Sequence, residues 1–277
     1  MKTTEYIAFT IDRFPKGYIF TYNDFTQQVK SIDPKQKIRP IGKEAIIKAL
    51  NRMVASGKIA KLSKGKYYKP KNTVFGNLQP DQYQVVKDLL EDDGKVTGYL
   101  TGYSIYNQLG FTTQVSNTIQ IGKNEIRPSL KRGYYTIAFI KQKNTITKDN
   151  IPLLQILDSI RYIKKIPDSS IESAGKRLLA IIKDLTNENK ITLVKLALKY
   201  PPAAKALLGA LLDTAGNTKL TEPLLKSLNP ISGYKFLGLD KVLNSATNKS
   251  ANSKSSNNKN ANSNNSGNSI KTKWNIK

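Results

Sequence analysis

The chain has 277 residues, enough for two domains, and 39% of them are hydrophobic, which is sufficient for well-packed cores. It contains 45 lysines and arginines against 20 aspartates and glutamates, a formal net charge of +25, and it has neither cysteine nor histidine. Disulfides, cysteine nucleophiles, cysteine-ligated metals and imidazole acid–base catalysis are therefore excluded. We expect no cofactor and no bound metal.

The first elements of the chain are predicted to be two helices and a turn. Residues 4–14 have apolar side chains at helical spacing and predict a helix. Thr21 is a candidate N-cap for the next helix, with Asp24 at the capping-box position that Glu usually occupies. This second helix should run to about Lys30, and Ser31-Ile32-Asp33-Pro34 predicts a turn after it.

The next stretch carries the clearest pattern in the sequence. Residues 41–55 predict an amphipathic helix, because their apolar residues recur at intervals of three and four. Its apolar face consists of Ile46, Leu50, Met53 and Val54. Ser56-Gly57 should end the helix, since glycine tolerates the left-handed conformation that a helix C-cap often needs. Two strands are expected to follow, Lys58–Leu62 and Lys66–Lys69, joined across Ser63-Lys64-Gly65.

Three helices followed by a hairpin is the element order of a winged helix-turn-helix, and we expect this fold over residues 1–75. The segment carries 16 basic and five acidic residues, a net charge of +11, and six lysines but no acid lie from Lys58 to Lys71. So basic a hairpin, directly after such a helix, indicates contact with a phosphate backbone. The alternative is that an AT-rich genome has inflated the use of lysine and asparagine.

In a helix-turn-helix protein the recognition helix enters the major groove, and here it would be the helix at 41–55. Asn51 and Arg52 are the candidates for reading bases, because Asn can bond adenine, and Arg guanine, in a bidentate manner. The expected phosphate contacts are Lys43 and Lys48 on this helix and Lys58, Lys61, Lys64 and Lys66 on the wing. If the strand alternates, only one of Tyr67 and Tyr68 can face the core. The alternative for the polar helix face is simple solvation.

A second domain is expected over residues 76–243, after a linker at 72–80. Helices are predicted at 81–91, 151–163, 171–185, 191–200, 203–213 and 222–228, with a small helix within 99–109 and strands at 118–121 and 134–140. Asp92-Asp93-Gly94 should stop the first of these helices. Because the strands precede most of the helices, the fold class is α+β.

The tail at 244–277 is rich in Asn, Ser and Lys and contains six basic and no acidic residues. Such a tract cannot bury enough apolar surface to offset the entropy of ordering it, so we expect it to be disordered. Its last eight residues contain the only tryptophan, Trp274. They are interpreted as a terminus without a role, with a short docking peptide as the alternative.

The sequence contains no candidate membrane span, because no run approaches 18 apolar residues. At its start, Met1–Glu5 leads directly into an amphipathic helix rather than into the apolar segment of a signal peptide. We therefore expect a soluble, cytoplasmic protein with no membrane partner.

Four strings in the sequence resemble the AbiEi-type antitoxins of abortive-infection (type IV) toxin–antitoxin systems. They are G-K-I-A-K-L-S-K-G-K-Y-Y-K-P (57–70), T-G-Y-S-I-Y-N-Q-L-G-F-T-T-Q-V (101–115), L-L-Q-I-L-D-S-I-R (153–161) and Y-P-P-A-A-K-A-L-L-G-A-L-L (200–212). With the preceding helices, the resemblance covers roughly residues 1–215. It implies an N-terminal winged helix that binds the operator of its own operon. It also implies a C-terminal antitoxin domain that counteracts a nucleotidyltransferase-like toxin, and a role in phage defence.

These strings also have purely structural interpretations. Asp158 and Arg161 are three residues apart on one predicted helix and could pair with each other. Pro201-Pro202 could simply mark the start of a helix, where proline is common. The leucines at 207, 208, 211 and 212 are more typical of a core than of an interface.

Two other classes of function compete with this interpretation. A metal-dependent nuclease needs a carboxylate followed by an acidic-x-Lys pair, and the nearest string, Asn124-Glu125-Ile126-Arg127, has arginine in place of lysine. The sequence has no phosphate-binding loop and no nucleotidyltransferase signature. The other class is an RNA-binding or protein-binding adaptor. The sequence favours a non-enzymatic antitoxin and autoregulatory repressor, with operator DNA and a nucleotidyltransferase-like toxin as partners.

Overall fold

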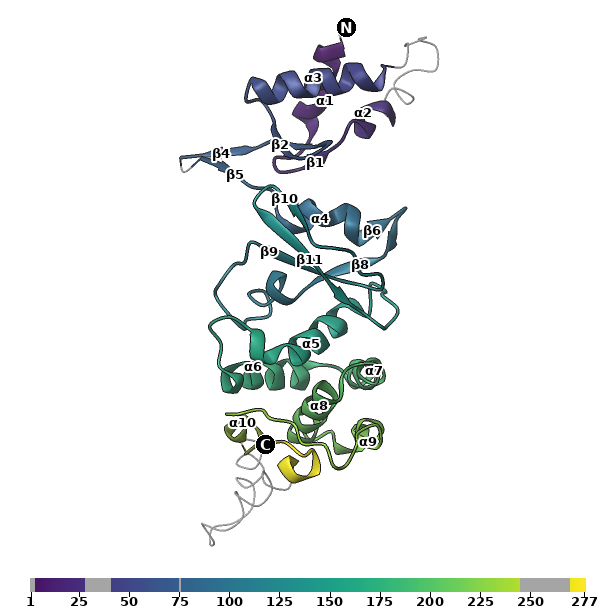
Figure 1. Ribbon diagram of the computed structural model, residues 1–277, viewed down its shortest axis with the longest axis vertical. Helices are drawn as coiled ribbons and strands as arrows, with labels where there is room; N and C mark the ends of the chain where they lie inside the picture. Colours follow the sequence, from purple (N-terminus) through teal and green to yellow (C-terminus); the bar gives the residue numbers. More distant parts are fainter. Residues whose placement is uncertain (1–2, 28–40, 75, 245–269) are drawn as a thin grey trace. The chain divides into compact units, whose positions relative to one another are not determined.

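The chain forms a mixed α/β fold with two compact units, and the computed structural model describes residues 3–27, 41–74, 76–244 and 270–277 (Figure 1). Unit 1 combines Met1–Leu89 with Ser129–Ile137, and unit 2 combines Leu90–Pro128 with Ala138–Lys277. Unit 1 therefore extends past residue 75 and takes a second segment from later in the chain.

The first half of unit 1 packs helices against a small antiparallel sheet. Its elements are α1 (Thr3–Arg13), β1 (Ile19–Phe20), α2 (Asn23–Gln27), α3 (Lys43–Ala55), β2 (Ala60–Ser63) and β3 (Lys66–Tyr68). The strand order is β1-β3-β2. The expected end of the second helix at Lys30 and the turn at residues 31–34 lie outside the described residues.

A single apolar cluster holds these elements together. Its largest fully buried side chains are Ile7, Phe20, Phe25, Ile46 and Leu50. They come from α1, β1, α2 and α3, and α1 packs directly against α3. The helical spacing at 41–55 thus reflects one buried face of α3, as expected from the sequence.

The end of α3 has a hydrogen-bonding pattern that glycine makes possible. Gly57 adopts a φ of 73°, and its N–H donates to the carbonyl of Val54 at 3.0 Å. The N–H of Lys58 donates to the carbonyl of Met53, also at 3.0 Å. These two bonds form a Schellman motif, which turns the chain sharply from the helix into β2.

The second half of unit 1 covers the other face of the sheet. It contains β4 (Lys71–Thr73), β5 (Gly76–Leu78), most of α4 (Gln82–Leu90), β10 (Leu130–Arg132) and the start of β11 (Tyr135–Lys141). The segment expected to be a linker therefore forms the β4–β5 hairpin instead.

As expected from strand alternation, only Tyr67 of the pair Tyr67-Tyr68 faces the helix-facing core, although both side chains are buried. Tyr67 stacks on Phe20 in the helix-facing cluster. Tyr68 donates a hydrogen bond to Gln79, from the segment before α4. Strand alternation holds, but the second half of unit 1 gives the sheet a second buried face.

Unit 2 begins with short strands. They are β6 (Glu91–Asp92), β7 (Lys95–Val96), β8 (Gly98–Thr101) and β9 (Thr118–Lys123), and a 3₁₀ turn spans Gly102–Ser104. The second half of β11 lies in unit 2, where the strand order is β11-β9-β8.

The stretch after α4 contains a turn and a strand that the sequence did not indicate. The predicted helix does end before Asp92-Asp93-Gly94, because α4 stops at Leu90. Asp93-Gly94 forms the two-residue turn between β6 and β7, and both residues adopt positive φ, as a type I′ turn requires. The start of the small helix expected at 99–109 is instead the strand β8, which pairs along its length with β9. For these residues, pairing with the distant strand β9 outweighs the local preference for a helix.

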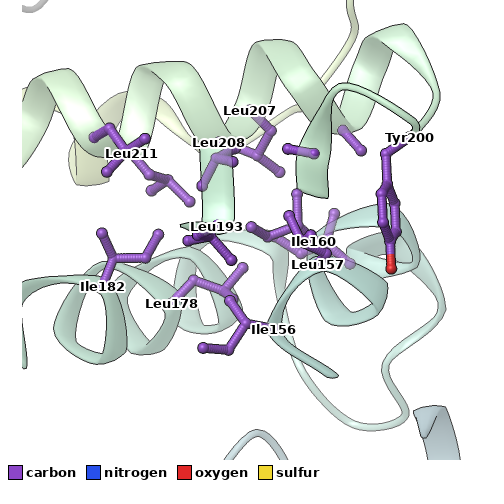
Figure 2. Packing of buried hydrophobic residues seen from close by; sticks show 14 of the residues in the cluster. Ile156, Leu157, Ile160, Leu178, Ile182, Leu193, Tyr200, Leu207, Leu208 and Leu211 are labelled. Atoms are coloured by element: carbon purple, nitrogen blue, oxygen red, sulfur yellow. The ribbon is translucent and has the colours of Figure 1, made fainter. Parts of the chain in front are cut away.

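The helices of unit 2 surround α8. They are α5 (Ile151–Arg161), α6 (Ile171–Asp184), α7 (Asn187–Ala197), α8 (Pro202–Thr214), α9 (Glu222–Lys226) and α10 (Asp240–Asn244), with 3₁₀ turns at Ile163–Lys165 and Thr218–Leu220. Every residue from Ala204 to Leu212 is buried, so α8 is enclosed on all sides. Leucines and isoleucines of α5, α6 and α7 pack against it, and Tyr200 stands at one end of this cluster (Figure 2). The helix α7 begins four residues before the predicted Ile191, because Thr186 caps it by accepting a hydrogen bond from the N–H of Asn189.

The end of the chain is part of the core of unit 2, contrary to its interpretation as a terminus without a role. Trp274 is 1% exposed, and its indole N–H donates to Asp213 of α8 at 2.7 Å. Gly209 makes this insertion possible, because a Cβ there would lie 2.1 Å from the indole ring. The disorder predicted for 244–277 is therefore wrong for residues 270–277. Residues 245–269 lie outside the described residues.

The C-terminal segment also forms backbone hydrogen bonds with the stretch before α10. The N–H of Tyr234 donates to the carbonyl of Asn275 at 2.7 Å, and that of Lys277 donates to the carbonyl of Tyr234 at 2.8 Å. The N–H of Phe236 donates to the carbonyl of Lys277 at 2.7 Å. Residues 270–277 therefore both fill the core beside α8 and hold residues 234–236 in place.

A buried carboxylate links the strands of unit 2 to its helices. Asp158 of α5 is 1% exposed and accepts hydrogen bonds from the hydroxyls of Tyr99 (2.7 Å), Thr101 (2.8 Å) and Tyr200 (2.9 Å). The amide nitrogen of Gln142 donates to both tyrosine hydroxyls at 2.8 Å. Every polar atom at the centre of this network has a partner, as burial requires.

Burial sets the ionisation of this network. It raises the pKa of the Asp158 carboxyl above its ordinary value, although the three hydroxyl donors partly oppose the shift. Burial also raises the pKa of Tyr99 and of Tyr200, and the neighbouring Asp158 charge adds to both shifts. The expected pairing of Asp158 with Arg161 is not formed, because the carboxylate points to the hydroxyls instead.

We predict that Trp274→Ala destabilises unit 2 by about 3–5 kcal/mol, the usual loss when a buried Trp is truncated. Gly209→Ala should also destabilise it, by about 1–3 kcal/mol, because the added methyl group overlaps the indole. Urea unfolding monitored by circular dichroism would measure both effects. Leu237→Ala is the control, since that side chain is 80% exposed. Equal stability of Trp274→Ala and wild type would contradict the insertion.

We predict a pH-dependent difference in stability between the wild type and Asp158→Asn. The folded-state pKa of Asp158 lies above the unfolded value near 4, so the folded chain holds this proton more tightly. The free energy of unfolding of the wild type, minus that of the variant, should fall as pH rises from about 4 through the raised pKa.

Denaturant titrations at a series of pH values would measure this difference. Asp149→Asn, at an exposed carboxylate of the same unit, is the matched control. A wild-type-minus-variant difference that stays constant across the window would contradict the raised pKa.

Candidate nucleic-acid interface

The exposed face of α3 carries the residues that the sequence singled out. Lys43, Lys48, Asn51 and Arg52 are all exposed. Lys48, Asn51 and Arg52 lie on the side of the helix opposite Ile46, Leu50 and Met53, together with the exposed acid Glu44, whereas Lys43 lies nearer the apolar face at the start of the helix. The amphipathic pattern fixes this arrangement, because burying the apolar face directs the cations and the amide towards solvent. The ammonium of Lys43 lies 4.6 Å from the centre of the Tyr22 ring, which holds it near the start of the helix.

Asn51 has a partner that the sequence did not indicate. Its side-chain oxygen accepts a hydrogen bond from the hydroxyl of Tyr67 on β3, at 3.1 Å. The bond fixes the orientation of the amide and connects α3 to the hairpin. The amide nitrogen and the second lone pair of the oxygen remain available for a ligand. No local pattern could have revealed this contact, because 16 residues separate its partners.

The β2–β3 hairpin presents three exposed lysines beside α3. Lys58 precedes β2, Lys61 lies on it, and Lys64 lies in the turn to β3. Among the described residues, ion pairs of unit 1 engage Lys66, Lys69 and Arg132, and none engages these three lysines. Their charges are therefore uncompensated at the surface.

Lys66, the fourth wing lysine of the prediction, has a structural role instead. Its ammonium lies 2.7 Å from the carboxylate of Asp88, on α4. Arg132 of β10 donates to the same carboxylate from both of its terminal nitrogens, one at 2.8 Å. Lys66 thus anchors the hairpin to the second half of unit 1. It is not available as a phosphate contact while this pair is formed, which corrects its assignment.

The ionisation of Asp88 agrees with this anchoring role. Partial burial alone would raise the pKa of its carboxyl, but hydrogen bonds and charge from Arg132 and Lys66 outweigh burial and hold the pKa below its ordinary value. The carboxylate is therefore charged at neutral pH and satisfies both cations. Asp88 lies 22 residues after Lys66 in the sequence and Arg132 lies 44 after Asp88, so spacing gave no signal for the triad.

Seven of the eight predicted residues thus lie on α3 or its adjoining hairpin with their polar groups at the surface. They are Lys43, Lys48, Asn51, Arg52, Lys58, Lys61 and Lys64. An amide and a guanidinium on an exposed helix, flanked by ammonium groups, can bond base edges and phosphates.

The residues considered for a nuclease lie in different environments. Glu125 is exposed, whereas Asp158 is buried and its carboxylate accepts three hydroxyl donors. Within the described ranges, no three or more acidic side chains are grouped so that they could hold a metal ion. No helix among the described residues is long and apolar enough to cross a membrane.

A solved structure has a similar fold. The RV2827C protein from Mycobacterium tuberculosis superposes with a TM-score of 0.51 over 84% of this chain and 84% of its own. The two sequences are 15% identical, so the likeness concerns the fold alone. No curated protein matches this sequence. Residues 7–194 match DUF6088, and because this match covers more than half of the chain, the protein belongs to DUF6088, a family of unknown function.

Proposed function

We propose that the protein is a DNA-binding regulator in which the first half of unit 1 acts as a winged helix-turn-helix. The observation that supports this most directly is the exposed cationic face of α3 beside the uncompensated lysines of the β2–β3 hairpin. In this proposal α3 enters the major groove and the hairpin is the wing. The strand order β1-β3-β2 and the sequence order of the helices are compatible with that fold.

The residues divide into two roles in this proposal. Arg52 and Asn51 read base edges, and the Tyr67 hydroxyl keeps the Asn51 amide in position. Lys43, Lys48, Lys58, Lys61 and Lys64 contact phosphates. Lys66 supports the wing through Asp88 rather than touching DNA.

The biological role we propose is that of a non-enzymatic, cytoplasmic antitoxin that represses its own operon. It rests on the resemblance of the sequence to AbiEi-type antitoxins, with unit 2 counteracting a nucleotidyltransferase-like toxin. Growth of cells that express the neighbouring toxin gene, with and without this protein, tests the antitoxin role. Unchanged toxicity on co-expression would reject that role without affecting the DNA-binding proposal.

Fluorescence anisotropy tests the DNA-binding proposal. The full-length protein is titrated into a duplex from upstream of its own gene and into a random duplex, over a salt series. Five phosphate contacts predict a slope of about −4.5 in log affinity against log salt, or roughly a 500-fold loss between 50 and 200 mM. Absence of preference for the upstream duplex would contradict the operator role.

We predict different effects for Arg52→Ala and Lys64→Ala. Arg52→Ala should weaken binding to the upstream duplex by about 1–3 kcal/mol and relax one base position, leaving the random duplex little affected. Lys64→Ala should weaken both duplexes alike and reduce the salt slope by about 0.9. Lys87→Ala, at an exposed lysine on α4, is the control and should change neither. Equal losses on both duplexes for Arg52→Ala would contradict the base-reading role.

A further inference from the structure

Two adjoining cavities in unit 2 share one arginine. The first has a volume of about 440 Å³ and lies between the end of β11 and the junction of α7 with α8. The second has a volume of about 350 Å³ and lies between the end of α5 and residues 233–236. Arg161, the last residue of α5, lines both. The N-terminal turn of α8 borders both as well, through Pro201-Pro202 in the first and Ala203-Ala204 in the second.

The residues lining the two cavities include cations and no acid. The first cavity is lined by Lys141, Lys143, Lys199 and Arg161, and the second adds Lys164, Lys165 and Lys235. Residues 151–243 as a whole contain 14 basic and eight acidic residues. The cavities are thus much more basic than the domain around them, and the positive end of the α8 dipole adds to this potential.

Arg161 forms no ion pair among the described residues, although its charge acts on the nearby Asp158 carboxyl and partly opposes the rise in the pKa of that group. The nearest candidate on its own helix, Asp158, is turned inward and accepts hydrogen bonds from three hydroxyls. The guanidinium lies instead 4.9 Å from the centre of the Tyr162 ring. This position orients the group without occupying its N–H donors, which suits bidentate binding of a phosphoryl group.

Hydrogen bonds hold the wall of the first cavity in place. Gln142 and Tyr200 line it, and both belong to the buried network of Asp158. The Gln142 oxygen accepts from the backbone N–H of Asn144, which fixes the loop that carries Lys141 and Lys143. The cations therefore surround a wall that hydrogen bonds hold in place, as is usual in ligand sites.

The second cavity offers aromatic surface. Tyr162, Tyr234 and Phe236 line it. Lysine ammonium groups lie over two of these rings, that of Lys165 at 5.8 Å from the centre of Tyr162 and that of Lys164 at 5.1 Å from the centre of Phe236. The backbone of Tyr234 is held by the C-terminal residues Asn275 and Lys277, so this wall is also fixed.

We propose that these cavities bind a nucleoside di- or triphosphate. The phosphoryl groups lie in the first cavity against Arg161, Lys143 and Lys199. The nucleoside lies in the second cavity, against the aromatic side chains that line it. Two cavities of this size that share an arginine, here called lobes, match a small ligand with a phosphoryl part and a nucleoside part. A polynucleotide would instead require a long, open basic stripe.

Isothermal titration of the full-length protein with ATP, AMP and inorganic tripolyphosphate tests this proposal. ATP and tripolyphosphate should bind saturably, and AMP at least about tenfold more weakly, because it lacks two charged acceptor groups. Arg161→Gln should weaken ATP and tripolyphosphate by about tenfold or more. Lys195→Gln is the matched control, since it removes an exposed charge from α7 outside the cavities and should leave both affinities unchanged.

Tyr234→Ala separates the two lobes. It should weaken ATP by about fivefold or more through loss of the aromatic contact with the base and leave tripolyphosphate unchanged. Thermal melting of each variant checks that it is folded. Failure of ATP to bind, or equal losses for Arg161→Gln and Lys195→Gln, would overturn the proposal. Saturable binding of a single-stranded RNA oligonucleotide in place of ATP would overturn it too.

Discussion

Burial of the Asp158 carboxylate is the constraint on which unit 2 depends. An ionised carboxylate removed from water is costly unless hydrogen bonds replace its hydration. The three hydroxyls bonded to Asp158 come from β8 and from the junction of α7 with α8, so satisfying one buried carboxyl group fixes strand and helices together. Because the carboxylate is turned towards these hydroxyls, Arg161, one turn later on α5, forms no ion pair with it and keeps its N–H donors at the surface. The position of Asp158 therefore determines both the internal network and the exposure of this guanidinium.

Unit 1 uses an acid in a similar way. Asp88 binds Lys66 and Arg132, and the hairpin is thereby attached to the rest of the unit. Because this acid is occupied internally, it does not neutralise Lys58, Lys61 or Lys64. The net charge of the chain is thus not distributed evenly. Acids hold the fold together, and cations remain exposed on surfaces that can bind an anion.

How much the sequence revealed depended on how local each interaction is. The spacing in α3 and the glycine at its end are local signals, and both features were predicted correctly. The roles of Lys66 and Asn51 depend on Asp88 and Tyr67, which lie far away in the sequence, so spacing could not reveal them. Trp274 was misinterpreted for the same reason. The polar tract before it is typical of disorder, and nothing nearby indicates the cavity that Gly209 leaves beside α8.

The C-terminal segment connects that hidden packing to the surface of unit 2. Trp274 is held by α8, and the residues after it hold the backbone of Tyr234 and Phe236. Those two aromatic residues line the second cavity, whose opposite side is formed by the end of α5. The shape of this cavity therefore depends on residues at the extreme end of the chain, although none of them lines it. Because a fixed wall loses little entropy on binding, the insertion of Trp274 would preorganise the site as well as stabilise the core.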